Sequence, residues 1–261
     1  MTPRRALVTG ASNGIGLELA RLLAADRIDV VLTARSADKL EALAAELRGS
    51  DGVDASVIVA DLGMPGAAAE VVERLGNAPI DILVNNAGFP QWGPFVGSDP
   101  AEMTSMLNVN MVALTELTRS LLPPMVDRGW GRILNLSSTA AFQPGPLMAV
   151  YYATKAYVLH LSLALNEEVR GTGVHVTALC PGATATGFQA RGGMEESRMV
   201  SGRTLPSAAR VAEVGYAAMK AGKPMVVEGT MNRVGAFATR LGPRTLNARA
   251  ARIAQDRVGR P

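Results

Sequence analysis

Cysteine and histidine are scarce in this sequence, and their scarcity excludes a fold held by internal disulfides and a zinc site with cysteine and histidine ligands. The 261 residues include one cysteine, Cys180, so no disulfide can form within the chain. The two histidines, His160 and His175, show no zinc-ligand spacing and lie beside no nucleophile, so both are interpreted as structural. Cys180 stands at a predicted strand end and is interpreted as a small buried residue. We expect a metal-free protein of the reducing cytoplasm.

Long apolar runs are missing too, and charge of one sign gathers in only one place. No run of roughly 18 apolar residues could cross a membrane, and the N-terminal MTPRRALVTG lacks the apolar core of a signal peptide. The net charge is only +3 and no basic stripe interleaves with aromatics, so nucleic-acid binding is not expected. The arginines gather in the tail 240–261, at positions Arg240, Arg244, Arg249, Arg252, Arg257 and Arg260, against the single acid Asp256. This tail is interpreted as a solvated surface, with recruitment of an acidic carrier or an acyl-CoA as the alternative.

The residues that are present indicate one α/β domain, residues 1–261. Apolar residues make up 48% of the chain and charged residues 19%, the balance of a protein with a sizeable core. Amphipathic stretches such as 38–48, 99–127 and 149–170 alternate with seven short apolar runs, at residues 6–10, 30–34, 56–60, 81–86, 132–138, 174–180 and 225–229. The runs are apolar on both faces, as strands are in a parallel sheet with helices on both sides. We therefore predict a doubly wound parallel sheet of about seven strands.

A glycine-rich loop, VTGASNGIG at residues 8–16, follows the first predicted strand. Gly10, Gly14 and Gly16 open a helix, and a second strand ends near residue 34. Missing Cβ atoms let backbone N–H groups approach a phosphate, whose charge the helix N-terminus favours. The loop predicts a dinucleotide site in a Rossmann-like fold. The alternative is a turn whose glycines serve only tight packing.

Further motifs follow the glycine loop in order. They are Asn85-Asn86-Ala87-Gly88, a serine at 138 after the fifth strand, Tyr151-x-x-x-Lys155 and Pro181-Gly182. Together with the spacing T-G-x-x-x-G-x-G in the loop, they resemble the short-chain dehydrogenase/reductase family from about residue 4 to 190. The resemblance implies an NAD(P)(H)-dependent oxidoreductase that interconverts a ketone or aldehyde and an alcohol.

The stretch VYYATKAY, residues 150–157, places two tyrosines near Lys155. Tyr151 precedes the lysine by four residues and Tyr152 by three, so helical periodicity does not choose between them. The resemblance selects Tyr151 as the proton donor and leaves Tyr152 as a packing or surface residue. An ammonium ~4 Å away would favour the phenolate by about 4 kcal/mol before desolvation. We therefore expect Lys155 to lower the pKa of Tyr151, and the resemblance adds a contact from Lys155 to the cofactor's ribose.

The resemblance implies two more catalytic residues. Ser138 would hold the substrate oxygen, with its neighbour Ser137 as the competing choice. Asn110 would use its carbonyl or its side chain to position a water that connects Lys155 to solvent, with Asn108 as the alternative. Asparagine is locally unfavourable inside a helix, which suits a functional role.

Further cofactor contacts are carried over by resemblance. They fall at Gly10, Ser12, Asn13, Gly14, Ile15, Gly16, Asp61, Leu62, Asn86, Ala87, Gly88, Pro181, Gly182 and Thr186, besides Tyr151 and Lys155. Asp61 has an alternative interpretation as the N-cap of a helix at 64–75. Thr186 would contact the carboxamide or cap the next helix.

The cofactor is predicted to be NADP in preference to NAD. A site for NAD usually has an acid at the end of the second strand, where this chain has Ala34 followed by Arg35. The guanidinium of Arg35 can bind a 2′-phosphate. Against this prediction stands Asn13, at a position where many NADP-dependent relatives carry a basic residue.

Mostly apolar residues in the loops after the strands predict the substrate pocket. They are Phe89, Trp92, Phe95, Phe142, Gln143 and Met148, together with Phe188 and Met194 in a lid at 186–206. These loops carry few charges, which favours a hydrophobic ketone or a 3-oxoacyl derivative as substrate. Non-redox epimerase or dehydratase chemistry on the same scaffold and a cofactor-sensing binding protein remain as alternatives. Relatives form dimers and tetramers through the helices at 99–127 and 149–170, so we expect a homodimer or homotetramer.

Overall fold

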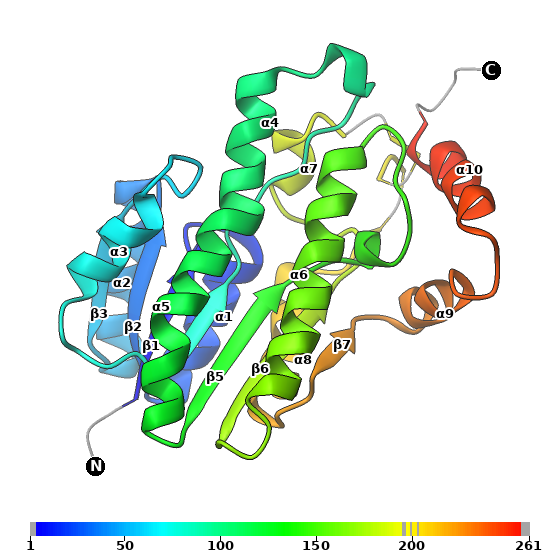
Figure 1. Cartoon of the computed structure of the whole chain (residues 1–261). Coiled ribbons are helices and arrows are strands. Elements are labelled where there is room, and N and C mark those ends of the chain that lie inside the picture. The colour runs from blue at the N-terminus through cyan, green and yellow to red at the C-terminus, as the bar shows by residue number, and fades with distance from the viewer. Residues whose placement is uncertain (1–3, 195–196, 199, 203, 257–261) are drawn as a thin grey trace.

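Seven parallel strands form one sheet in the order β3-β2-β1-β4-β5-β6-β7 (Figure 1). The computed structural model describes residues 4–194, 197–198, 200–202 and 204–256. The strands are β1 Arg5–Thr9, β2 Asp29–Ala34, β3 Ala55–Val59, β4 Ile82–Asn85, β5 Gly131–Leu136, β6 Val174–Cys180 and β7 Met225–Val227. The prediction of a doubly wound parallel sheet is confirmed, and each strand begins and ends at most two residues from its expected bounds.

Helices cover both faces of the sheet, which explains why the strands are apolar on both sides. The helices are α1 Gly14–Ala25, α2 Ala37–Asp51, α3 Ala67–Leu75, α4 Pro100–Leu107, α5 Ala113–Asp127, α6 Ala149–Glu168, α7 Phe188–Arg191, α8 Ala208–Lys220, α9 Thr230–Ala238 and α10 Arg244–Gln255. Along β1, Ala6 and Val8 pack in the core that contains α1, α2 and α8. Leu7 between them packs in the core that contains α3, α5 and α6, two of which lie in front of the sheet in Figure 1.

The predicted helix at 99–127 is interrupted. Asp99 caps α4 by accepting a hydrogen bond from the backbone N–H of Ala101 at 2.9 Å, but α4 ends at Leu107. A π-helical turn, Asn108–Val112, separates it from α5. A turn of this kind is rare and widens the helix at one point, often at a functional site. Asn110, one of the predicted catalytic residues, lies in its middle.

A chain of buried amides and hydroxyls joins the sheet to the helices in front of it. Asn85 Nδ2 at the end of β4 donates to Thr118 Oγ1 of α5 at 3.0 Å and to Asn135 Oδ1 of β5 at 2.9 Å. Asn135 Nδ2 in turn donates to Ser162 Oγ of α6 at 2.9 Å. All four side chains are buried, so each lost partner leaves a polar group without water to replace it. The network therefore fixes where α5 and α6 sit relative to the strand ends.

Two helices at the C-terminal end lie outside these layers. Figure 1 shows α9 and α10 at the edge of the molecule beyond β7. None of the nine residues of α9 is buried, whereas α10 buries Ala251 and Gln255. Within the described part of the chain, no helix has the length and hydropathy needed to cross a bilayer.

The buried amide chain generates a stability prediction. Asn135→Ala should lower the free energy of unfolding by about 2 to 4 kcal/mol, because it opens a cavity and removes one of the hydrogen bonds of Asn85 Nδ2 and one of those of Ser162 Oγ. Denaturant unfolding at neutral pH measures the difference. Ser162→Ala, which removes only the outer end of the chain, is the control and should cost about 1 kcal/mol. Equal effects of the two substitutions would contradict a coupled network.

Candidate active site

The ends of β1 and β4 are tied together by one asparagine and one threonine. Asn86 Nδ2 donates to the carbonyl oxygens of Thr9 at 2.9 Å and Gly10 at 3.1 Å. Thr9 Oγ1 accepts from the backbone N–H groups of Asn86 and Ala87, both at 2.9 Å. The chain runs outward in opposite directions from this pair of strands, and a sheet of this class opens a ligand crevice at that point.

The three predicted glycines of the loop are required at their positions for different structural reasons. A Cβ on Gly10 or Gly16 would come within 2.7 or 2.3 Å of Asn86 Nδ2, so both positions must be small for the asparagine to fit. Gly14 has a φ of +57°, which disfavours other residues, and it opens α1. Gly16 is buried and away from the cleft, whereas Gly10 and Gly14 line it. The packing interpretation of the loop therefore accounts for Gly16, and Gly10 serves packing as well.

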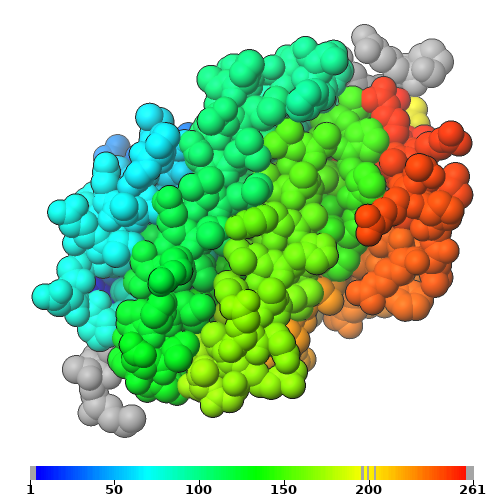
Figure 2. Space-filling view, viewed as in Figure 1, coloured from blue at the N-terminus to red at the C-terminus, as the bar shows by residue number. Residues whose placement is uncertain are grey.

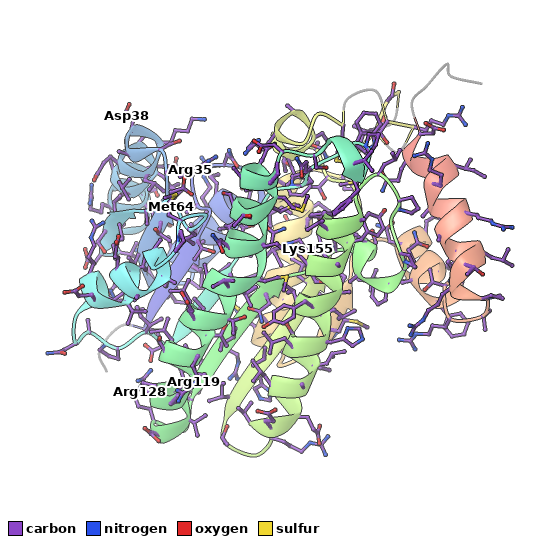
Figure 3. The ribbon with its side chains drawn as sticks, turned by 45° about the horizontal axis from the view of Figure 1, so that its top comes forward. Arg35, Asp38, Met64, Arg119, Arg128 and Lys155 are labelled. Carbon is purple, nitrogen blue, oxygen red and sulfur yellow. The ribbon has the colours of Figure 1, made fainter. Side chains whose placement is uncertain are left out.

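A cleft of about 350 Å³ extends along the carboxyl ends of the strands. Of the predicted site residues it is lined by Gly10, Ser12, Asn13, Gly14, Ile15, Arg35, Asp61, Leu62, Asn86, Ala87, Gly88, Ser138, Tyr151, Lys155, Pro181, Gly182 and Thr186. In Figure 3, Arg35 lies on the side of β2 and α2 and Lys155 lies on α6, and the cleft extends between them. Asn110 and Gly16 lie behind its wall.

Tyr151 and Tyr152 have different surroundings on α6, although helical periodicity did not separate them. Lys155 Nζ lies 5.7 Å from the centre of the Tyr151 ring and donates to the carbonyl oxygen of Leu136 at 2.8 Å. The side chain of Tyr151 is also hydrogen-bonded to Ser138. Tyr152 is buried, and its Oη accepts from Gln255 Nε2 at 2.5 Å. The structure thus brings Tyr151, Ser138 and Lys155 together and gives Tyr152 a packing role.

The two serines after β5 also differ. Ser137 is buried and its Oγ donates to the carbonyl oxygen of Lys155 at 2.9 Å. Ser138 Oγ accepts from the N–H of Ala140 at 3.1 Å and makes a long 3.4 Å bond to the carbonyl oxygen of Pro181. Ser138 is only half-buried and lines the cleft, so it is the serine with a hydroxyl available to a ligand.

Asn110 uses its side chain to hold the loop after β4. Its Oδ1 accepts from the N–H of Phe89 and its Nδ2 donates to the carbonyl oxygen of Phe89, both at 3.2 Å, and to Thr154 Oγ1 at 3.1 Å. A Cβ on Gly88 would lie 2.7 Å from Asn110 Oδ1, so the glycine lets the two segments approach. Both hydrogens of Nδ2 are therefore used, and the side chain of Asn110 fixes this loop to α6. Asn108 donates to the carbonyl oxygen of Gly63 at 2.9 Å and is structural.

Two predicted cofactor contacts have local roles as well. The interpretation of Asp61 as a helix N-cap is wrong, because α3 begins at Ala67 and Asp61 Oδ1 accepts from the N–H of Gly63 at 3.0 Å. Asp61 is exposed and lines the cleft. Thr186 Oγ1 accepts from the N–H of Phe188 at 3.2 Å and lines the cleft, whereas the N-cap position of α7 is Gly187.

Half of the predicted substrate-pocket residues lie elsewhere. Phe89, Met148, Phe188 and Met194 line the cleft, whereas Trp92, Phe95, Phe142 and Gln143 do not. Phe95 is exposed in a short 3-10 turn, and Phe142 packs on the cluster around Cys180. The predicted lid at 186–206 contains α7, and its residues 195–196, 199 and 203 lie outside the described residues.

The far end of the chain supplies part of the pocket wall, which no sequence motif indicates. Gln255, the last residue of α10, is fully buried and lines the cleft. Its Nε2 bonds to Tyr152, and its backbone carbonyl accepts from Trp92 Nε1 at 3.0 Å. Among the described residues its Oε1 has no hydrogen-bond partner. A buried amide oxygen in this state is suited to accept a bond from a ligand.

Comparison with known proteins identifies the family. The family model for short chain dehydrogenases matches residues 4–196. The chain belongs to the short-chain dehydrogenase/reductase family. The relatives described next are reductases and dehydrogenases, as the resemblance of the motifs implied.

Two curated relatives and one solved structure illustrate the likeness. A ketoacyl reductase, HetN, of Nostoc sp. is 34% identical over 235 residues, covering 89% of this chain and 80% of that protein. The very-long-chain 3-oxoacyl-CoA reductase of Homo sapiens is 36% identical over 69% of this chain, which spans only 59% of that protein's length. A short-chain dehydrogenase from Sphingobium yanoikuyae in complex with NADPH superimposes with a TM-score of 0.82 at 34% identity, covering 91% of this chain and 93% of that one.

Burial sets the charge of the two central groups of this family member. Desolvation raises the pKa of Tyr151 above its ordinary value, although the hydrogen bond from Ser138 opposes the rise. Desolvation lowers the pKa of Lys155 to about 8. The expected lowering of the tyrosine pKa by the lysine is therefore not found, because the lysine loses its proton before the tyrosine does. Below pH 8 the pair consists of an ammonium and a phenol.

The lowered lysine pKa predicts a pH-dependent stability. In the unfolded chain Lys155 has a pKa near 10.4, so between pH 8 and that value only the unfolded state keeps the proton. The unfolded state then binds more protons, and the free energy of unfolding must rise with pH. Compared with Lys155→Met, which cannot titrate, the parent should gain about 1 to 2 kcal/mol between pH 7.5 and 9.5.

Denaturant unfolding of both proteins across this pH range measures the gain. Subtracting the free energy of unfolding of the variant from that of the parent removes the contributions of the tyrosines and Cys180. Burial raises the pKa of the Cys180 thiol to about 11. A difference that stays constant with pH would mean that the lysine titrates at its ordinary pKa.

Proposed function

We propose that this family member reduces a hydrophobic ketone or 3-oxoacyl derivative to the alcohol, with NADPH as the reductant. The observation that carries the proposal is the meeting of Ser138, Tyr151 and Lys155 beside apolar residues of the cleft that form a pocket, where the ring of Phe188 lies 5.6 Å from that of Tyr151. That pocket includes Phe89, Phe188 and the other apolar residues named above.

The residues along the cleft fit a nicotinamide dinucleotide. Glycine at position 10 and glycine at position 14, which opens α1, leave room for a pyrophosphate at the N-terminus of α1. Asn86 fixes the loop that would carry it. When bound, the nicotinamide supplies the hydride. This chain's own residues then bind and orient both molecules and control the proton.

Each member of the set has a role that its surroundings support. Ser138 donates a hydrogen bond to the carbonyl oxygen of the substrate, and Tyr151 gives that oxygen its proton. The raised pKa keeps Tyr151 protonated at neutral pH, which suits donation and hence the direction of reduction. Lys155, buried behind it, supplies positive charge below pH 8 and has two N–H groups left for a ribose hydroxyl and a water. The carbonyl of Asn110 holds that water.

The two tyrosines give a direct test. Tyr151→Phe should lower turnover by roughly 10²- to 10⁴-fold, because it removes the proton donor and keeps the ring. Tyr152→Phe is the matched control: it keeps the ring, loses the bond from Gln255 and should stay within a few-fold of the parent. The measurement is NADPH consumption against a panel of ketones and aldehydes. A dead Tyr152→Phe beside an active Tyr151→Phe would reverse the assignment.

The same panel separates the competing functions. A cofactor-sensing protein would bind NADPH without consuming it against any carbonyl compound. An epimerase or dehydratase would convert its substrate with no net loss of NADPH.

NADPH is proposed over NADH from the residues that follow β2. Arg35 is exposed and lines the cleft, and none of the ion pairs among the described residues involves it. Ser36 beside it occupies the N-cap of α2, yet its side chain makes no capping bond. A guanidinium, a hydroxyl and a helix N-terminus together suit a 2′-phosphate. Support also comes from the neighbour that holds NADPH.

Arg35→Ala should weaken NADPH binding by roughly 10- to 150-fold, the value of a hydrogen bond to a charged group, and leave NADH almost unchanged. Adding Ala34→Asp should then favour NADH. Dissociation constants for both cofactors decide the matter, with Lys223→Ala, at an exposed position before β7, as a control for the loss of charge alone. A parent that binds the two cofactors equally well would refute the proposal.

The substrate class is proposed from the pocket and from the relatives. The pocket is mainly apolar, and the relatives include reductases of ketoacyl and 3-oxoacyl-CoA compounds. An acyl thioester is therefore a candidate beside free ketones. The unpartnered Oε1 of Gln255 would accept a hydrogen bond from a donor on the distal part of the substrate. A cytoplasmic homo-oligomer that pairs through α5 and α6 remains part of the proposal.

A further inference from the structure

Exposed apolar residues gather on the last two helices. Six of the twelve large hydrophobic side chains that are exposed in the described part of the chain fall between 231 and 253. They are Met231, Val234, Phe237, Leu241, Leu246 and Ile253. Figure 2 shows this segment, orange to red, as one outer edge of the molecule. A concentration of this kind marks an interaction surface, because isolated exposed residues would be scattered.

The pattern along each helix forms a stripe. At 100° per residue, Met231, Val234 and Phe237 fall within about 120° of one another on α9. Leu246 and Ile253 are seven residues apart and lie within about 20° on α10. A nine-residue helix with no buried residue is marginal in water by itself, so cover on the apolar stripe would stabilise α9.

The charge of the same segment is of one sign. Residues 230–256 contain five arginines and one acid, Asp256, which gives a net charge of +4 by subtraction. All five arginines are exposed; they are Arg233, Arg240, Arg244, Arg249 and Arg252. On α10, Arg249 lies about 60° from Leu246, so its stem can follow the apolar stripe while its guanidinium reaches outward.

We propose that α9 and α10 dock on the surface of an anionic lipid bilayer, lying in the plane of the headgroups. The apolar stripes enter the acyl boundary and the arginines pair with lipid phosphates, which is how a basic amphipathic helix binds. A second copy of the chain fits less well, since a twofold contact would bring arginines of both protomers together. An acidic protein would pair with the arginines but leave Phe237 and Leu241 in water.

Docking would also place the pocket close to the bilayer, because α10 ends at Gln255 in the pocket wall. This last step rests on the proposed function, since it gives an apolar carbonyl substrate a short path from the lipid. Vesicle binding itself needs no turnover, so its failure and a failure of the reductase assignment are separate results.

The test is sedimentation of the full-length protein with vesicles of phosphatidylcholine alone or mixed with phosphatidylglycerol. We expect binding to the mixed vesicles that weakens as salt is added, and little binding to the neutral ones. Absence of binding to the mixed vesicles, or equal binding to both kinds, would overturn the proposal.

Matched variants separate the apolar and charged contributions. Phe237→Ser should weaken binding roughly 10-fold, while Phe95→Ser should not, although the two rings are 60% and 62% exposed. Arg252→Glu should weaken it about 5-fold or more, and Lys39→Glu on α2, which changes net charge equally, should not. Figure 1 shows α2 on the opposite side of the molecule from α10. All four side chains are exposed, and circular dichroism checks that each variant folds.

Two further outcomes would also count against the bilayer. If Arg252→Glu lost vesicle binding while Phe237→Ser bound as tightly as the parent, the surface would be one for polyanions or acidic proteins in general. A mass by light scattering that falls to the monomer in Phe237→Ser, without vesicle binding by the parent, would assign the face to a second copy.

Discussion

The hydrogen bonds of one amide, that of Asn86, hold the two halves of the cleft together. The loops after β1 and β4 must diverge for a crevice to open, yet a cofactor site requires them to keep a fixed separation. Asn86 sets that separation by bonding to two carbonyl oxygens of the glycine loop. Thr9, at the end of β1, accepts hydrogen bonds from the backbone N–H groups of Asn86 and Ala87. Glycine at positions 10 and 16 is a consequence of this clamp as much as of any ligand.

Burial is the second constraint, and it acts in opposite directions on the two titrating groups. Isolated tyrosine and lysine have similar pKa values, near 10. In this site the interior disfavours both charged forms, so the phenol becomes a weaker acid and the ammonium a stronger one. The lysine therefore works as a source of positive charge only below about pH 8. An account based only on the attraction between the ammonium and a phenolate would omit desolvation, which has the larger effect on both pKa values.

Sequence patterns predicted what depends on nearest neighbours along the chain. Continuous apolar runs predicted the seven strands, because a strand covered on both faces cannot alternate. The order of motifs predicted which loops share the cleft, since all follow parallel strands. The π-helical turn at Asn110 was not predictable from helical periodicity, because it coincides with tertiary bonds to Phe89 and Thr154. Phe95 and Trp92 look like pocket residues from their position after β4, but the direction of that loop decides their surroundings. Gln255 reaches the cleft from the end of the chain, and nothing local in RIAQD indicates it.

The position of Gln255 bears on the order in which the molecule is completed during synthesis. Every strand from β1 to β6, and with them the glycine loop, Ser138, Tyr151 and Lys155, precedes residue 181. The residues of the cleft floor are therefore synthesised before the last helices. The wall that contains Gln255 forms only when α10 packs against Trp92 and Tyr152. A chain cut short before α10 would thus keep the residues that line the nucleotide end of the cleft but lack this part of the pocket wall, and an extension fused just after α10 would lie beside that wall.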